Sequence, residues 1–281
     1  NFKDHKIKAD IKKNKLTING SGKIKIQENF DEVQYKIDFK DEDFKLNSQL
    51  ILSELKLNNQ KYLENFIKYS DNTTTLKDQK IEISFNKKEL LLKGSGKIKF
   101  DSNFEDIKFK VLKNENKLNF NTQVDLEKTS FKIDFLNFEK NDSLKTQIKV
   151  LGSYKPNNSL IFDDISIIDE KNNITFKNIY LGEDNTIEEV EKINLEFSDN
   201  QNKRNQILLK KINKNNYQIS GSSFNADKLI NSLLIDKKND QTNFFKNDFK
   251  ISLSIKEVYL DNLNSINNLN GNFNIKNNEI Y

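Results

Sequence analysis

Hydrophobic and polar residues alternate one by one along most of this chain. The segment from residue 33 to residue 39 is typical, because single polar residues separate Val33, Tyr35, Ile37 and Phe39. Successive side chains of a β-strand point to opposite faces, so this pattern predicts strands with one apolar and one polar face. The same alternation recurs at residues 16–26, 118–126, 131–135, 148–150, 174–176, 193–197 and 249–255. The Asn-, Asp- and Lys-rich stretches between the runs predict the turns of an antiparallel sheet.

Helical periodicity is confined to two short segments. The first is the apolar stripe of Tyr62, Leu63, Phe66 and Ile67, and the second is 226–234, which Asn225 is placed to cap. Both stripes are interpreted as packing faces. Two short helices cannot cover the apolar faces of about fifteen strands, so these faces either close on each other or curve into a groove. We expect an all-β protein: a long, antiparallel, repeat-containing and curved sheet, forming a β-groove, with one or two short helices.

An internal repeat is present in the first half of the chain. The heptapeptide at 20–26, Gly-Ser-Gly-Lys-Ile-Lys-Ile, returns at 94–100 as Gly-Ser-Gly-Lys-Ile-Lys-Phe, and the shift from Gly20 to Gly94 defines the repeat offset. Nine of the eighteen positions from 20 to 37 are identical to their counterparts, and apolar positions match apolar positions. The repeat predicts two equivalent strand pairs. A phosphate-binding loop is a poor interpretation, because neither copy ends in Gly-Lys-Ser/Thr or leads into a helix.

Composition excludes several kinds of chemistry. The 281 residues are 35% hydrophobic and include 21 Phe, which is too apolar for a disordered chain. There is no Cys and a single histidine, His5, which removes disulfides, thiolate metal sites and the usual Ser-His-Asp triad. The acidic runs at 41–43 and 163–164 are interpreted as surface turns. We therefore expect no catalytic residue, no metal site, no cofactor and no enzymatic activity.

The charge of the chain and its N-terminal residue add little to the predicted fold and function. The formal net charge is +4, with Lys and Asp/Glu interspersed, which favours a solvated surface over a nucleic-acid interface. Residues 1–25 are more basic and are interpreted as an exposed strand surface. The chain lacks Met even at position 1, so we interpret it as a piece of a longer or processed protein. No apolar run reaches the roughly 18 residues that would span a bilayer.

One passage in the last third resembles a known family. Residues 218–234, Gln-Ile-Ser-Gly-Ser-Ser-Phe-Asn-Ala-Asp-Lys-Leu-Ile-Asn-Ser-Leu-Leu, are similar to the strand, Gly, Phe-Asp/Asn-Ala and short-helix passage of the AsmA-like bacterial envelope proteins. Residues 248–258 and 269–275 resemble the strands that follow in that family, and 160–197 has a similar hairpin pattern. Asn225 stands where Asp is expected. The predicted organisation is repeated hairpin units at 1–150, starting near 16 and 90, and an AsmA-like segment at 151–281 with a short helix near 226–235.

The resemblance implies a periplasmic protein of Gram-negative bacteria, anchored in the inner membrane by a segment outside this chain. It implies that phospholipid acyl chains are sheltered in the groove during transport to the outer membrane and in envelope maintenance, with phospholipid and outer-membrane components as partners. The groove is predicted to be lined by Ile24, Ile26, Val33, Tyr35, Ile37, Ile98, Phe100, Ile107, Phe109 and Val111. The alternative is a non-enzymatic extracellular structural or adhesin β-repeat protein with a closed core, which accounts for the same alternation.

Overall fold

The computed structural model describes residues 1–40, 43–58, 73–100, 102–140, 144–155, 159–182, 187–228, 230, 248–276 and 279–280. Strands make up nearly all of the described structure, which confirms the all-β, mostly antiparallel fold. The chain divides into two compact units, Asn1–Thr129 and Ser130–Tyr281, a boundary earlier than the one expected at 150. The helical stripe predicted at 62–67 lies outside the described residues.

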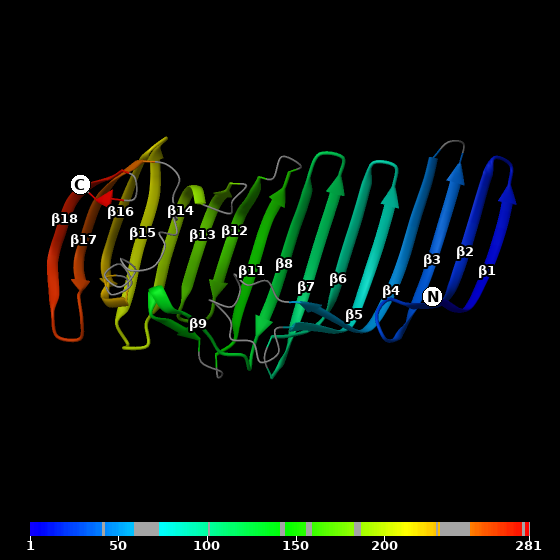
Figure 1. Ribbon diagram of the computed structural model, residues 1–281, viewed down its shortest axis with the longest axis horizontal. Coiled ribbons are helices and arrows are strands. Elements are labelled where there is room, and N and C mark those ends of the chain that lie inside the picture. Colours follow the sequence, from blue (N-terminus) through cyan, green and yellow to red (C-terminus); the bar gives the residue numbers. More distant parts are fainter. Residues whose placement is uncertain are drawn as a thin grey trace. The chain divides into compact units, whose positions relative to one another are not determined.

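Unit 1 is an open antiparallel sheet in which each strand pairs with the next (Figure 1). Its strands are β1 (Phe2–Lys12), β2 (Lys15–Lys25), β3 (Phe30–Lys40), β4 (Asp43–Asn58), β5 (Thr73–Asn86), β6 (Glu89–Lys99), β7 (Phe104–Asn114) and β8 (Leu118–Leu126). Among its described strands, β1 pairs only with β2, and β8 is not paired with β1, so the sheet does not close into a barrel.

The sequence repeat is also a structural repeat. The bounds of β6 and β7 are those of β2 and β3 shifted by the repeat offset, and the pairings β2–β3 and β6–β7 have equivalent registers. Even the irregularities repeat: the β1–β2 register shifts between Lys3 and Lys6, and the β5–β6 register shifts between Lys77 and Lys80. Asp4 and Asp78, with φ of 54° and 52°, mark the two bulges. The prediction of two equivalent strand pairs is confirmed.

Unit 2 begins with a short hairpin and continues as a larger sheet. Its elements are β9 (Phe131–Ile133), a 3-10 helix (Asp134–Leu136), β10 (Phe138–Lys140), β11 (Thr146–Tyr154), β12 (Leu160–Ile168), β13 (Asn173–Leu181), β14 (Ile187–Ser198), β15 (Arg204–Asn213), β16 (Asn216–Asn225), β17 (Phe249–Tyr259), β18 (Ser265–Lys276) and β19 (Glu279–Ile280). Neighbouring strands from β11 to β16 and from β17 to β19 are antiparallel, but β16 and β17 are parallel.

Two local expectations in unit 2 are corrected. The alternation over residues 131–135 predicted one strand, but the strand ends at Ile133 and the 3-10 helix contains Phe135. Asn137 follows in the left-handed conformation, with φ of 54°, and this turn brings β10 back along β9. The parallel pair β16–β17 departs from a purely antiparallel sheet, because a crossover rather than a tight turn connects the two strands.

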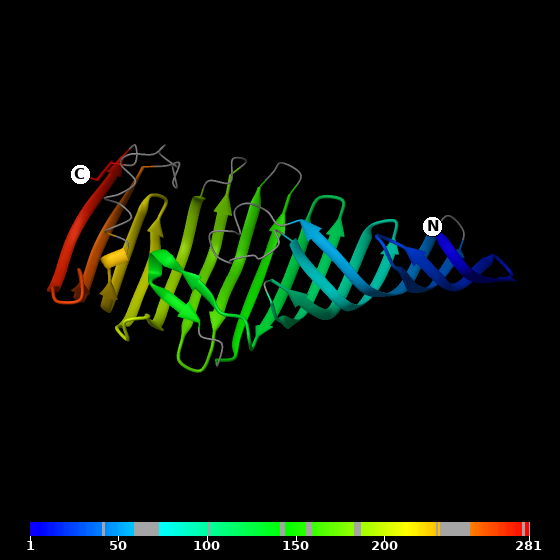
Figure 2. The same cartoon turned by 60° about the horizontal axis from the view of Figure 1, so that its bottom comes forward.

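The β9–β10 hairpin lies on one face of the unit 2 sheet (Figure 2). The ring of Phe138 packs edge-on against Phe197 of β14, with 5.5 Å between the ring centroids. Phe138, Phe197 and Ile174 are each at most 1% exposed. The amide of Asn200 donates to the carbonyl oxygen of Asn137 over 3.1 Å, which holds the hairpin at the end of β14. Part of the apolar face of unit 2 is therefore a sealed core.

A helical turn follows β16. Asn225 caps it, because its side-chain Oδ1 accepts from the Asp227 amide over 3.2 Å, and the Ile230 amide donates to the Ala226 carbonyl over 2.8 Å. The start of the helix predicted at 226–234 is thereby confirmed. Leu229 and residues 231–235 lie outside the described residues.

Candidate functional site

The candidate site is the apolar face of unit 1. In the first repeat, Val33, Tyr35 and Ile37 of β3 lie opposite Gly22, Gly20 and Ile18 of β2. In the second repeat, Ile107, Phe109 and Val111 of β7 lie opposite Gly96, Gly94 and Leu92 of β6. Directly opposed residues of antiparallel strands share a face, so each repeat presents one apolar face built to the same plan.

Strands β4 and β5 join the two repeats into one continuous apolar surface. Ile37 lies opposite Leu46 of β4, Leu46 lies opposite Phe85 of β5, and Phe85 lies opposite Leu90 of β6. The rings of Phe39, Phe44 and Phe85 pack in succession at this end, with centroid distances of 6.1 and 5.4 Å. The apolar side chains of this face are mostly half-buried, by packing against each other along the sheet.

The structure places eight of the ten predicted lining residues on this shared face. Ile98 and Ile107 are buried, whereas Ile24, Val33, Tyr35, Ile37, Phe109 and Val111 are half-buried. The other two, Ile26 and Phe100, follow the last residues of β2 and β6 and lie in the turns. Ile26 is 44% exposed. The strand alternation that included these two residues ends one residue before each of them.

The glycines of the Gly-Ser-Gly motifs leave space for large side chains of neighbouring strands to pack against the backbone. A Cβ atom on Gly20 would lie 2.1 Å from Tyr35 Cζ, and one on Gly94 would lie 2.1 Å from Phe109 Cζ. A Cβ on Gly22 would meet the ring of His5 at 2.3 Å, and one on Gly96 would meet Gln79 Nε2 at 2.4 Å. The motif therefore lets side chains lie flat on the face. The sequence analysis missed the contacts of His5 and Gln79 with the motif.

Replacing Gly94 by Ala is expected to lower the free energy of unfolding by about 1–3 kcal/mol, because the Phe109 ring must leave its place. The matched control is Gly271→Ala in β18, where the new Cβ meets Phe273 only at 3.4 Å. Urea unfolding monitored by circular dichroism measures both variants. Equal unfolding midpoints for Gly94→Ala and Gly271→Ala would contradict this account of the motif.

Two buried acids occupy equivalent positions at one end of the face. Asp31 Oδ1 accepts from the amide and the hydroxyl of Ser53, both over 2.7 Å. Glu105, its counterpart in the second repeat, accepts from the amides of Glu127, Lys128 and Thr129 over 2.9, 2.8 and 2.6 Å. Burial raises the pKa of Glu105, but these donors, led by the Glu127 amide, outweigh it and leave the pKa below its ordinary value. The sequence analysis missed this pair, although the repeat offset relates them.

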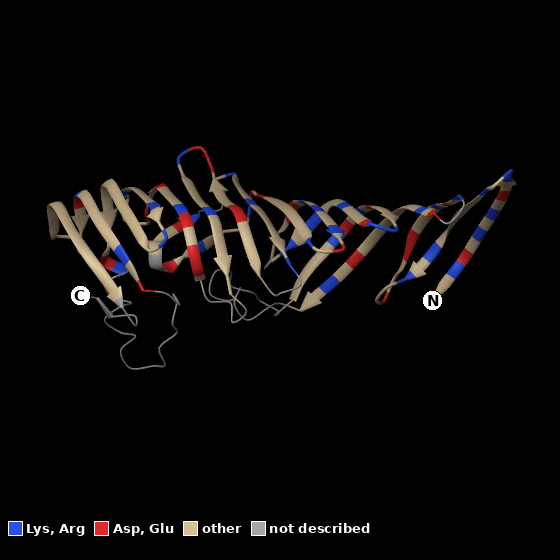
Figure 3. Ribbon diagram, turned by 90° about the horizontal axis from the view of Figure 1, so that it is seen from above, with Lys and Arg blue, Asp and Glu red and all other residues tan. Residues whose placement is uncertain are grey.

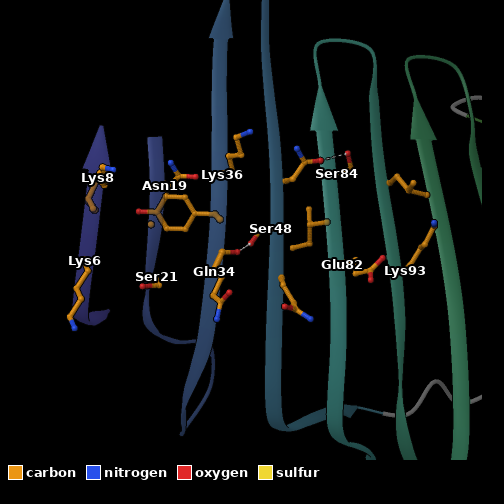
Figure 4. Close-up of a pocket in the computed structure, with 17 residues that line it drawn as sticks. Lys6, Lys8, Asn19, Ser21, Gln34, Lys36, Ser48, Glu82, Ser84 and Lys93 are labelled. Atoms are coloured by element: carbon orange, nitrogen blue, oxygen red, sulfur yellow. Dashed lines mark hydrogen bonds between the residues drawn. The ribbon is translucent and has the colours of Figure 1, made fainter. Parts of the chain in front are cut away.

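The opposite face of unit 1 is polar, and its residues are the majority of those that line a hollow of about 940 Å³, which Tyr35 of the predicted groove also lines (Figure 4). Lysines, amides and hydroxyls from β1 to β6 line most of it, with Glu82 as the acidic member. Ser84 donates to Asn47 Oδ1 over 3.0 Å within the lining. Acidic and basic residues are mixed along these strands (Figure 3), and hydrogen bonds from Thr17 and Lys15 lower the pKa of Asp38 on this face to about 2.

A metal site requires clustered ligands, and a membrane-spanning helix requires a long apolar run. No cluster of three His, Asp or Glu side chains able to hold a metal ion occurs in them. They also contain no helix with the length and hydrophobicity needed to cross a membrane. The side chains of the apolar face offer non-covalent contact to aliphatic or aromatic groups.

Comparison with known proteins leaves the family of this chain a prediction. No family model, no curated protein and no solved structure matches the chain.

Proposed function

We propose that the apolar face of unit 1 shelters phospholipid acyl chains, and that the chain is a segment of an AsmA-like protein of the Gram-negative envelope. Such a protein passes phospholipid from the inner to the outer membrane and maintains the envelope. The proposal includes an inner-membrane anchor outside this chain, a periplasmic location, and outer-membrane components as further partners. It includes no enzymatic step and no nucleic acid.

The observation that carries the proposal is a continuous apolar surface that no second layer covers among the described residues of unit 1. The surface runs across β2 to β7, and every described element of unit 1 is a strand of the same sheet. Keeping an acyl chain of about 16 carbons out of water requires a favourable transfer free energy on the order of 12 kcal/mol, at about 0.8 kcal/mol for each buried CH₂ group. Half-buried Ile, Leu, Phe and Val side chains supply such contacts. Because these contacts are non-directional, many positions along the face are nearly equivalent and the lipid can slide.

The second candidate is a structural or adhesin β-repeat protein with a closed core. The sealed packing of the β9–β10 hairpin on unit 2, where Phe138 and Phe197 are 1% and 0% exposed, favours it. The two candidates differ in what covers the face of unit 1. Lipid covers it in the first, whereas protein covers it in the second.

Site-specific photo-crosslinking separates these candidates. A photoreactive amino acid at Ile37 or Phe109, in the protein expressed in a Gram-negative envelope with labelled phospholipid, is expected to capture lipid. Matched controls carry the same group at Lys36 or Lys110, the neighbouring residues that point to the polar face. Capture at the apolar positions above the controls supports lipid binding. Equal capture on both faces, or none at Ile37 and Phe109, counts against it.

A charge on this face is expected to impede lipid capture more than folding. Ile37 is half-buried, so in Ile37→Asp the carboxylate keeps access to water and stability falls by no more than about 1–2 kcal/mol. Lipid capture at Phe109 is expected to fall in this variant and to persist in the control Lys36→Asp. Unfolding and crosslinking are measured on the same samples. Loss of folding without prior loss of capture would indicate a sealed core.

A further inference from the structure

A row of exposed polar side chains crosses unit 1 on the face opposite the apolar surface. Gln34 of β3 lies opposite Gln49 of β4, and Gln49 lies opposite Glu82 of β5. Glu82 in turn lies opposite Lys93 of β6, and Lys93 lies opposite Lys110 of β7. All five side chains are exposed, and we call them the polar row. Neighbouring strands are about 4.8 Å apart, so the row is about 19 Å long.

The polar row runs along the hollow of unit 1. Gln34, Gln49, Glu82 and Lys93 line this hollow of about 940 Å³, and Lys110 continues the row on the next strand (Figure 4). The volume lies within the range of ligand pockets, which is about 300–1,000 Å³. The row crosses five strands, so an extended ligand fits it better than a compact one.

The part of the row on β3 to β5 offers hydrogen bonds to hydroxyl groups. A side-chain amide both donates and accepts, and a carboxylate accepts. Within the described part of the chain, the side chains of Gln34, Gln49 and Glu82 form no hydrogen bond to another residue. Ligand hydroxyls can therefore replace the water on these groups without breaking an internal hydrogen bond.

The part of the row on β6 and β7 is cationic. Lys93 and Lys110 are directly opposed, and like charges at such positions destabilise a sheet. Asp106, the acidic residue of β7 on this face, pairs with Lys97 over 2.7 Å. An anionic group between Lys93 and Lys110 would replace their repulsion by two charge-assisted hydrogen bonds. The lysine pair therefore indicates an anion site.

We propose that the polar row binds an acidic glycan in which neutral sugars separate the carboxylates. Sugar hydroxyls contact Gln34, Gln49 and Glu82, and one sugar carboxylate lies between Lys93 and Lys110. A uniformly charged polyanion fits less well, because Glu82 repels a negative group beside it. A single-stranded nucleic acid also fits less well, because the row has no aromatic side chain on which bases stack. The proposal is independent of the proposed lipid function, which concerns the other face.

Fluorescence polarisation with a labelled hyaluronan oligosaccharide tests the ligand class, because this glycan alternates a uronate with a neutral sugar. The 281-residue protein is titrated into the probe at low salt. Saturable binding is expected, and a neutral chitin oligosaccharide or polyglutamate is expected to compete at least about tenfold less well than unlabelled hyaluronan. Equal competition by either, by a single-stranded oligonucleotide or by phosphatidylglycerol vesicles would overturn the proposal. So would the absence of saturable binding.

A paired lysine variant tests the anion site. Lys93→Gln with Lys110→Gln is expected to weaken hyaluronan binding about two- to thirtyfold, and by less at high salt, because two exposed ion pairs are lost. The matched control is Lys23→Gln with Lys45→Gln, which removes the same charge from exposed positions opposite Glu32 and Asp38, outside the row. The control is expected to change binding by less than about twofold. Equal weakening in both would show that total charge, not the row, holds the glycan.

A second variant and a stability measurement complete the test. Gln34→Ala with Gln49→Ala is expected to weaken binding at every salt concentration, because neutral hydrogen bonds are not screened, and unchanged binding would contradict the proposed contacts. Without glycan, the lysine variant is expected to unfold at a urea concentration no lower than the wild type, because it removes a like-charge repulsion. Weaker binding then does not arise from lost folding. A lower unfolding midpoint would contradict the anion site.

Discussion

Asn225→Asp is expected to lower the free energy of unfolding by about 3 kcal/mol or more at neutral pH. Asn225 is 1% exposed, and its Nδ2 donates to Asp199 Oδ2 over 2.6 Å and to Gln201 Oε1 over 3.1 Å. An aspartate would remove both donors and place a second carboxylate against Asp199, which is 5% exposed. The hydrogen bond from Asn225 Nδ2 to Asp199 requires a donor at this position, which an ionised aspartate does not supply.

A compensating exchange tests the explanation. In the double variant Asn225→Asp with Asp199→Asn, the amide and the carboxylate change places, and much of the lost stability is expected to return. The single variant is also expected to become more stable as the solution is acidified, because one proton between the two carboxylates restores a hydrogen bond. Chemical unfolding of both single variants and the double variant measures the coupling. Additive losses in the double variant would show that the two side chains do not interact in this way.

Glu105→Ala is expected to cost at least about 3 kcal/mol, because three amide donors, of which that of Thr129 is buried, lose a charged acceptor and each such bond contributes about 1.5–3 kcal/mol. The side chain is 3% exposed, so water does not readily replace it. The control Glu115→Ala, in the exposed turn after β7, is expected to change stability by no more than about 0.5 kcal/mol. Urea unfolding at neutral pH compares them, and similar midpoints for the two variants would contradict the prediction.

The pH dependence of this effect has a definite sign. The folded-state pKa of Glu105 lies below its ordinary value, so its ionised form stabilises the fold. That contribution is fully present above the unfolded pKa of about 4.3 and is lost as the pH falls through the folded pKa. The stability difference between the wild type and Glu105→Ala is therefore expected to narrow at acidic pH. A difference that stays constant as the pH falls well below the unfolded pKa would mean that shape rather than charge stabilises the site.

The strands themselves could be predicted from the sequence. Alternation with a period of two depends only on neighbouring residues, so the runs around Tyr35 and Phe109 and the repeat that relates them were visible without a structure. The apolar faces of these strands follow directly, because opposite faces of a strand meet different environments. The same rule misplaced Ile26 and Phe100, because alternation does not mark the residue at which pairing stops.

The long-range contacts of the fold could not be predicted in this way. His5 packs on Gly22 and Gln79 packs on Gly96, and each contact depends on a register between two strands. The 3-10 helix that contains Phe135 interrupts a regular alternation, and the hairpin around it packs on Phe197, far away in the sequence. Local propensity is overridden there because burial against Phe197 requires the chain to reverse.

Local patterning thus specified the all-β class, the duplicated unit and the residues of the apolar face. Tertiary structure decided which strand edges are paired, which acids are buried, and where the apolar face is sealed or open. The physical reason is that side-chain alternation is encoded within a few residues, whereas pairing and coverage depend on which distant strand becomes the neighbour. Asp31 and Glu105 illustrate this difference, since only the folded chain brings them to the amides that hold them.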